Sequence, residues 1–266
     1  MRKKILVCVV ISLSLTGMVW AVDEDLVKKT QNPMAHIISI PFQNNTYFNI
    51  GPFNRSENVL NIQPVIPFLI GDACIAARTI VPIVNQPNYL AETGSTSGLG
   101  DINETIFFSP SIKQAVIFGL GPSVTFPTGS ETTLTSGKYS AGPALVVLTQ
   151  PEHWTLGLLA KNEWSFAGDK SRKDVNNMLI QPFITYNLGA GWNIATAPQI
   201  IADWEAQMSE DQWLVPASGG IGKIFYLGRL PINIGAHGYY FAVKPENIPC
   251  PDWTLRATLA TYLPAF

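Results

Sequence analysis

Three histidines, His36, His153 and His237, are the residues of this sequence best suited to acid–base chemistry. No catalytic triad, pair of carboxylates at a recognisable spacing, metal-ligand cluster or phosphate-binding loop accompanies them in the sequence. We therefore expect no enzymatic activity and no cofactor. His237 lies at an inward position of a predicted strand, where a hydrogen-bonded wall residue is a simpler interpretation than a catalytic base.

Polar side chains at the inward positions of predicted strands offer a different chemistry, the selection of solutes by charge, which rings of charged residues perform in pores. The charged candidates are Arg78, Lys161, Glu163, Lys223 and Arg256, with Asp203 close to a rim; the neutral candidates are His237, Asn61, Gln63, Gln181, Asn193 and Gln199. Lys161 and Glu163 are two residues apart and so share one face of a strand. A purely structural role, as salt bridges across the interior, therefore stays open.

These positions depend on strands that alternate with a period of two. In residues 116–127, VIFGLGPSVTFP, large apolar residues alternate with mostly small, uncharged ones. Twelve such segments are predicted, near 36–46, 58–70, 74–83, 101–109, 115–127, 139–149, 154–165, 177–188, 192–203, 213–224, 230–242 and 253–263. Most are close to the ~9–11 residues that a tilted strand needs to cross a bilayer.

The connections between these segments alternate between short and long. Residues 71–73 and 189–191 are short links, whereas 47–57, 84–100 and 166–176 are longer and more polar. Outer-membrane barrels have short periplasmic turns and longer extracellular loops. The sequence therefore predicts an all-β fold, an antiparallel transmembrane β-barrel of about 12 strands over residues 36–266, with both termini in the periplasm. A soluble β protein is the less favoured alternative.

The composition agrees with a bacterial outer-membrane protein. Charged residues make up 14% of the chain, against about 25% in soluble domains. Six tryptophans beyond residue 21 fall at predicted strand ends, where barrels carry aromatic girdles; they are Trp154, Trp164, Trp192, Trp204, Trp213 and Trp253. Tryptophan at strand ends of any β protein is the alternative reading of this pattern.

Residues 1–21 predict a secretory signal peptide, with a basic start, an apolar run and cleavage after Ala21; an uncleaved anchor helix is the alternative. Cleavage takes three basic residues from 17 and leaves 14 against 19 acidic ones, a net charge of −5, which argues against a nucleic-acid partner. Residues 22–35 form a short periplasmic segment, either a tail or a plug. Cys74 and Cys250 fall on opposite sides of the predicted membrane and are expected to be free thiols.

Two features fit a barrel poorly. Glu104 falls on the lipid-facing phase, although near the outer end of its strand, where a charge costs little. Prolines within strands remove donors from the hydrogen-bond ladder, so bulges or early strand ends are expected there. The prolines concerned are Pro64, Pro82, Pro122, Pro182, Pro198 and Pro216.

Several motifs resemble a family of bacterial outer-membrane proteins named for the MetA pathway of phenol degradation, whose members are often labelled transporters or neuromedin U. The motifs are GLGD (98–101), FFSP (107–110), GPSVTFPTGS, KYSAGPALVVL, WSFAGD, QPFITYNLGAGW, PQIIADWEA and VPASGGIGK. The resemblance runs from about Gln31 to the C-terminus and implies a single-chain barrel that transports small, including aromatic, solutes. The terminal Phe266 resembles the signal that barrel-assembly machinery reads, although family members commonly end with a basic residue.

We therefore expect an outer-membrane channel or transporter for small solutes, including hydrophobic or aromatic compounds, with membrane lipid and the barrel-assembly machinery as further partners. Twelve strands lie between the ~8 of filled barrels and the ~16–18 of open porins, which predicts a narrow or gated lumen. The alternative is a plugged surface barrel that acts as a structural or interaction protein through its extracellular loops.

Overall fold

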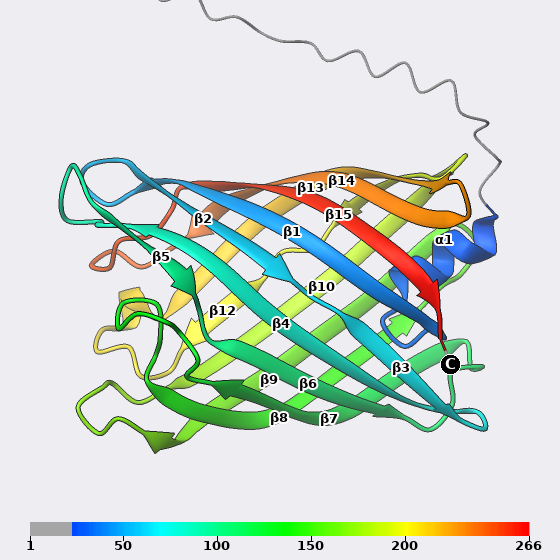
Figure 1. Cartoon of the computed structure of the whole chain (residues 1–266), viewed down its shortest axis with the longest axis horizontal. Helices are drawn as coiled ribbons and strands as arrows, with labels where there is room; N and C mark the ends of the chain where they lie inside the picture. The colour runs from blue at the N-terminus through cyan, green and yellow to red at the C-terminus, as the bar shows by residue number, and fades with distance from the viewer. Residues whose placement is uncertain (1–22, 266) are drawn as a thin grey trace, which may run out of the picture.

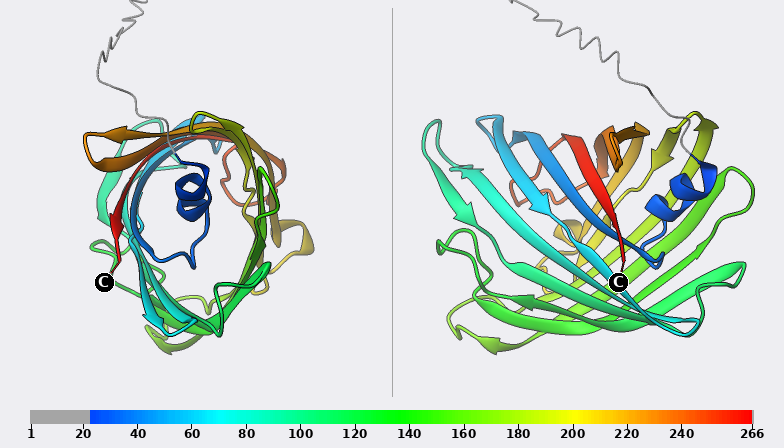
Figure 2. Two further views of the ribbon diagram at one scale, coloured as in Figure 1. Left: turned by 90° about the vertical axis from the view of Figure 1, so that its right-hand side faces the viewer. Right: turned by 45° about the vertical axis from the view of Figure 1, so that its right-hand side comes forward.

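The computed structural model describes residues 23–265, which form a closed antiparallel barrel with a short helix in one mouth (Figures 1 and 2). The elements are α1 (Glu24–Gln31), β1 (Ile37–Ile50), β2 (Arg55–Ile62), β3 (Val65–Ile70), β4 (Ala73–Pro87), β5 (Ser95–Leu99), β6 (Ile102–Ser109), β7 (Val116–Phe126), β8 (Lys138–Thr149), β9 (Trp154–Gly168), β10 (Asn176–Gly189), β11 (Trp192–Thr196), β12 (Ile200–Asp203), β13 (Trp213–Leu227), β14 (Leu230–Val243) and β15 (Trp253–Pro264), with a 3-10 turn at Ser209–Asp211. The predicted signal peptide and Phe266 lie outside the described residues.

Fifteen strands make a twelve-position barrel because three positions are each shared by two strands. β2 and β3 both pair with β1 and β4, β5 and β6 both pair with β4, and β11 and β12 both lie between β10 and β13. The remaining neighbours follow the chain, β15 pairs with β1, and β9 pairs with β10. The predicted barrel of about 12 strands is confirmed.

Proline accounts for two of the three interruptions and for one bulge. Pro64 separates β2 from β3, and Pro198 separates β11 from β12. The register between β13 and β14 shifts between Val215 and Pro216. Proline cannot donate a ladder hydrogen bond, so a closed sheet must break or bulge where it occurs. Pro122 and Pro182, by contrast, stay within continuous strands.

The end of the barrel that holds α1 and the last residues of β15, here called the α1 end, carries the connections 71–72, 110–115, 150–153, 190–191 and 228–229; the opposite end is the loop end (Figure 1). The predicted loop 47–57 is too long, because Tyr47 and Glu57 pair within β1 and β2. The connection is the turn 51–54, in which Gly51 and Asn54 have positive φ values of 66° and 49°. Residues 84–87 and 95–99 of the predicted loop 84–100 likewise belong to β4 and β5. Polar strand ends that project beyond a bilayer need no apolar face, so alternation did not reveal them.

The outward face of the barrel is apolar. In β7, Val116, Phe118 and Leu120 are 52%, 38% and 53% exposed, whereas Ile117 between them is 7% exposed. Consecutive side chains of a strand point to opposite faces. The predicted lipid-facing phase of this strand is therefore the outward phase of the barrel.

The tryptophans fall in two groups at the two ends of the barrel. Trp154 and Trp192 begin β9 and β11 at the α1 end. The others lie toward the loop end; they are Trp164, Trp204, Trp213 and Trp253. Trp164 lies four residues before the end of β9 rather than at it. Two bands of this kind are the aromatic girdles of a membrane barrel.

One acidic side chain, Glu104, lies on the outer wall, and the two cysteines of the described chain are unpaired. Glu104 faces outward in register with Thr79, whose hydroxyl donates to its carboxylate at 2.5 Å. Cys74 lies near the start of β4 and Cys250 in the connection before β15, and both are free thiols. No helix within the described residues is long and apolar enough to cross a membrane.

Candidate functional site

The structure places all but one of the sequence-predicted site residues inside the barrel. Register shows this for pairs that share a face: Asn61 is opposite Gln43, and Arg256 is opposite both Asn45 and His237. The residues with inward side chains are Arg78, Lys161, Glu163, His237, Arg256, Asn61, Gln63, Gln181, Asn193 and Gln199. Asp203 ends β12 near the loop end and pairs with Lys173 at 2.8 Å.

Lys223 is the exception, and its predicted inward position is wrong. It is opposite Trp192 in the register, and its Nζ lies 4.8 Å from the centre of that ring on the outer surface. Ile221, two residues earlier, is 47% exposed, and Ile224 is buried. Small residues on both faces of β13 hid the phase of this strand. A lysine at a membrane boundary can extend its amine to water while its stem lies along an aromatic ring.

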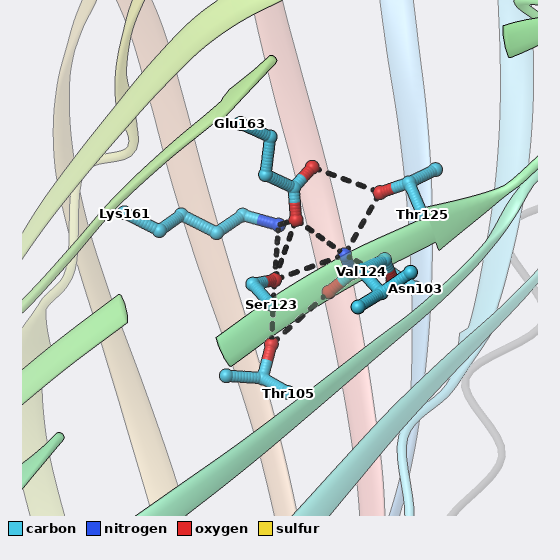
Figure 3. Close-up of polar contacts among 7 residues, drawn as sticks. All are labelled: Asn103, Thr105, Ser123, Val124, Thr125, Lys161 and Glu163. Atoms are coloured by element: carbon cyan, nitrogen blue, oxygen red, sulfur yellow. Dashed lines mark hydrogen bonds and ion pairs between the residues drawn. The ribbon is translucent and has the colours of Figure 1, made fainter. Parts of the chain in front are cut away.

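One wall of the interior carries a carboxylate surrounded by donors (Figure 3). The Glu163 carboxylate accepts from Ser123 Oγ at 2.5 Å, Thr125 Oγ1 at 2.8 Å and Asn103 Nδ2 at 2.9 Å. Lys161 Nζ lies 3.0 Å from the same carboxylate. These side chains come from β6, β7 and β9, and Glu163 is 7% exposed. We call this group the Glu163 network.

The polar lining next to this network carries two arginines, of which Arg78 on β4 is in register with Thr105 of β6. Arg78 Nη2 donates to Gln63 Oε1 at 3.0 Å, and Gln63 Nε2 in turn donates to Gln43. Arg256 Nε donates to Asn45 Oδ1 at 2.6 Å, and its guanidinium lies 4.8 Å from the ring centre of Tyr239. Gln43 and Asn45, two residues apart on the inward face of β1, thereby link the two arginines. A band of charge therefore runs around this part of the lumen.

Sequence reasoning missed several residues of this lining. Asn45 is fully buried and holds Arg256, yet no face of segment 36–46 was assigned. Tyr239, which shares the inward face of β14 with His237, packs against the Arg256 guanidinium. Asn103 adjoins Glu104, whose outward phase was predicted, so the same alternation could have placed Asn103 inside. In each case the period-two pattern indicates an inward position. The role of the side chain depends on its contact partner on another strand, which only the structure shows.

The remaining wall beside Arg256 is apolar and aromatic. A cavity at this level is lined by Tyr47, Gln199, Ile201, Leu214, Pro216, Tyr239, Phe241, Thr254 and Arg256. One charged group thus faces a surface of rings and branched aliphatic side chains. The lining is suited to an amphipathic molecule rather than to a hydrated ion alone.

The N-terminal segment occupies the mouth at the α1 end. Figure 2 shows α1 inside the ring of strands. Gln31 accepts from Thr155 Oγ1 at 2.7 Å and donates to Asn187 Oδ1 at 2.7 Å. Gln150 Nε2 donates to the carbonyl of Lys28 at 2.8 Å. The described part of this segment, from residue 23, therefore enters the mouth of the barrel.

Below the helix, Met34 is fully buried in the hydrophobic core of the barrel. Its buried neighbours come from β4, β6, β7, β8 and β9; they are Cys74, Ala76, Phe107, Ile117, Ala144, Val146, Leu148 and Leu159. The interior is therefore divided into an apolar layer near the α1 end and a charged layer farther toward the loop end.

Two of the three histidines, His153 and His237, lie next to charged side chains. His153 Nδ1 lies 3.5 Å from Glu24 at the rim of the barrel. His237 lies beside Arg256 with its buried Nδ1 lacking a hydrogen-bond partner. The described chain also holds no group of three or more histidine, cysteine or acidic side chains that could bind a metal ion.

Known structures share this architecture. An outer-membrane channel from Pseudomonas putida F1 matches with a TM-score of 0.65 and 15% identity over 85% of this chain and 94% of that chain. The fold is that of outer-membrane β-barrels. The NanC porin matches with a TM-score of 0.53 and 9% identity over 84% of this chain and 98% of that one. No protein-family model matches the sequence, and no curated protein matches it.

Proposed function

We propose that the protein is a channel of the bacterial outer membrane for small solutes, including hydrophobic or aromatic ones, and that it has no enzymatic activity. In this proposal the α1 end faces the periplasm, so both termini are periplasmic. The apolar outer face contacts membrane lipid after insertion by the barrel-assembly machinery. The resemblance to the family named for the MetA pathway of phenol degradation supports the same role, as does the similarity in fold to an outer-membrane channel.

The observation that carries the proposal is the charged layer inside the barrel. Arg78, Lys161, Glu163 and Arg256 all point inward, from the three strands β4, β9 and β15. Removing charged groups from bulk water is costly, and an interior that served only stability would be filled with apolar side chains. Charged rings inside barrels and channels instead select what passes.

The plugged surface barrel remains the second candidate, and the helix in the mouth is the observation that favours it. α1 and Met34 fill the α1 end, where a solute would leave the lumen. In a channel this segment must move aside or leave a path beside it. In a plugged barrel it stays in place.

Conductance of the mature protein in a planar bilayer separates the two candidates. We expect discrete steps, and a larger open probability for the double variant Gln31→Ala/Met34→Ala, because it removes the polar and apolar contacts that hold the segment. Lys29→Ala is the matched control, since Lys29 pairs with Asp25 on the exposed side of the same helix. A folded, heat-modifiable barrel that stays silent in all three forms would instead establish the plugged barrel.

A further inference from the structure

Two charges of the lumen have no countercharge within the described residues. Arg78 and Arg256 each donate a side-chain hydrogen bond, but the acceptors, Gln63 and Asn45, are neutral amides. No ion pair in the described part of the chain joins either guanidinium to a carboxylate within 4.0 Å, whereas Lys161 is paired with Glu163. The two arginines therefore differ from the lysine of the same layer.

The nearby carboxylates are already committed elsewhere. Glu163 is held by the four donors of its network. Glu57, which pairs in register with Tyr47 above Arg256, accepts a hydrogen bond from the Tyr89 hydroxyl at 3.0 Å. Neither carboxylate is placed to neutralise the arginines.

The two guanidinium groups also reach the same part of the lumen. Arg78 of β4 is joined through Gln63 to Gln43, and Arg256 of β15 donates to Asn45, two residues from Gln43 on the inward face of β1. The two positive charges therefore lie near each other and repel. Arg256 is 9% exposed, so water screens this repulsion weakly. An anion between them would relieve the repulsion and accept charge-assisted hydrogen bonds from both groups.

The surroundings of Arg256 add a second requirement. Its cavity is walled by Tyr47, Ile201, Leu214 and Phe241. An inorganic anion would leave this apolar surface without a partner. A molecule with a negatively charged head and an apolar body satisfies both parts of the site.

We propose that Arg78 and Arg256 form a binding site for a small organic monocarboxylate whose apolar body lies against the wall of Ile201, Leu214 and Phe241. The proposal rests on the channel function and deepens it by naming the class of solute. Arginine is suited to the role, because its planar guanidinium binds a carboxylate through two parallel hydrogen bonds and keeps its charge in a protein interior.

Calorimetric titration of the folded, full-length mature barrel tests the site directly. The probes are hexanoate, hexanol and hexylammonium, which share a chain and differ in charge. We expect hexanoate to bind more tightly than the other two. Arg78→Gln and Arg256→Gln should each weaken hexanoate binding by about ten- to a hundredfold, the loss of a hydrogen bond to a charged group. The hexanoate affinity of Arg256→Lys, which keeps the charge but lacks the paired donors of a guanidinium, should lie between those of the glutamine variants and the wild type.

Lys223→Gln is the matched control, because it removes the same charge from the outer surface. Its hexanoate affinity should equal that of the wild type. Equal binding of hexanoate and hexanol, or unchanged affinity in both arginine variants, would overturn the site. A shift in heat-modifiable gel mobility verifies that each variant has folded before it is titrated.

Reversal potentials under a hexanoate gradient separate failure of the site from failure of the channel. Hexanoate preference in the wild type that falls in Arg256→Gln supports both proposals. A barrel that binds hexanoate but never conducts keeps the site and overturns the channel. Conductance that favours chloride over hexanoate equally in all variants keeps the channel and overturns the carboxylate site.

Discussion

The two sides of the charged layer differ in how the protein compensates their buried charges. Around Glu163, three uncharged donors and Lys161 surround one carboxylate on β6, β7 and β9. Around Arg78 and Arg256, two like charges meet neutral amides and a tyrosine ring. The carboxylate of the first side has its partners within the protein. The arginines of the second side gain a countercharge when an anion is present. The difference indicates that the Glu163 network fixes the shape of the lumen and the arginines face the solute.

The largest expected effect comes from breaking the Glu163 network. Glu163→Ala leaves the Lys161 ammonium and three donors without their acceptor in a site where Glu163 is 7% exposed. We expect a loss of about 3 kcal/mol in the free energy of unfolding, the usual cost of removing one partner of a buried pair. Urea unfolding in lipid vesicles measures it. A loss below about 1 kcal/mol would mean that lumen water replaces the network.

A smaller loss is expected from removing one donor of the same network. Ser123→Ala deletes the hydroxyl that donates to Glu163 at 2.5 Å and leaves the ion pair with Lys161 in place. The expected cost is about 1.5 kcal/mol, typical of a hydrogen bond to a charged group. The same unfolding experiment measures it, and Ser171→Ala, in an exposed loop, is the control. A cost equal to that of Glu163→Ala would show that the network fails as a unit.

Removing a charge from the side of the arginines should change stability little. Arg256→Met keeps much of the side-chain volume and removes a guanidinium that has no carboxylate partner among the described residues. We expect the free energy of unfolding to stay within about 1 kcal/mol of the wild type, because the lost bond to Asn45 is offset by relief of repulsion with Arg78. A loss of unfolding free energy as large as that of Glu163→Ala would show that Arg256 stabilises the fold as much as the Glu163 network does.

The smallest effect is expected at the loop end, where an ion pair lies outside the membrane-spanning strands. Lys138 Nζ lies 2.8 Å from Asp174, and this hydrogen bond holds the pKa of Asp174 below its ordinary value of 3.8. A lowered carboxyl pKa stabilises the folded state above 3.8, and that stabilisation is lost as the pH falls through 3.8 toward the lowered value. The protection of the amides of residues 169–175 against hydrogen exchange, relative to an unstructured chain, should therefore fall below about pH 4. Asp174→Asn should show low protection at every pH; an unchanged protection profile in this variant would exclude the ion pair as the cause.

Alternation with a period of two was sufficient to predict the barrel and most of its inward residues. Where one face is large and apolar, as with Val116, Phe118 and Leu120, the phase cannot be mistaken. Lys223 shows the limit of this reasoning. Glycine and alanine on both faces of β13 gave no apolar stripe, and polarity alone placed the lysine inside. The strand ends around Tyr47 and Glu57 were missed for a related reason, since strands beyond the bilayer carry no apolar face.

Local patterns of side chains in the sequence were enough to predict the class of fold, the twelve positions of the barrel and which face of most strands points outward. The tertiary structure decided which inward residues meet. Arg256 reaches Asn45 across 211 residues of chain only because β15 closes the barrel against β1. The position of residues 24–31 was also decided by contacts distant in the sequence, since Gln31 meets Thr155 and Asn187 across 124 and 156 residues of chain. Register and closure are properties of the whole sheet, so no single segment of the sequence contains them.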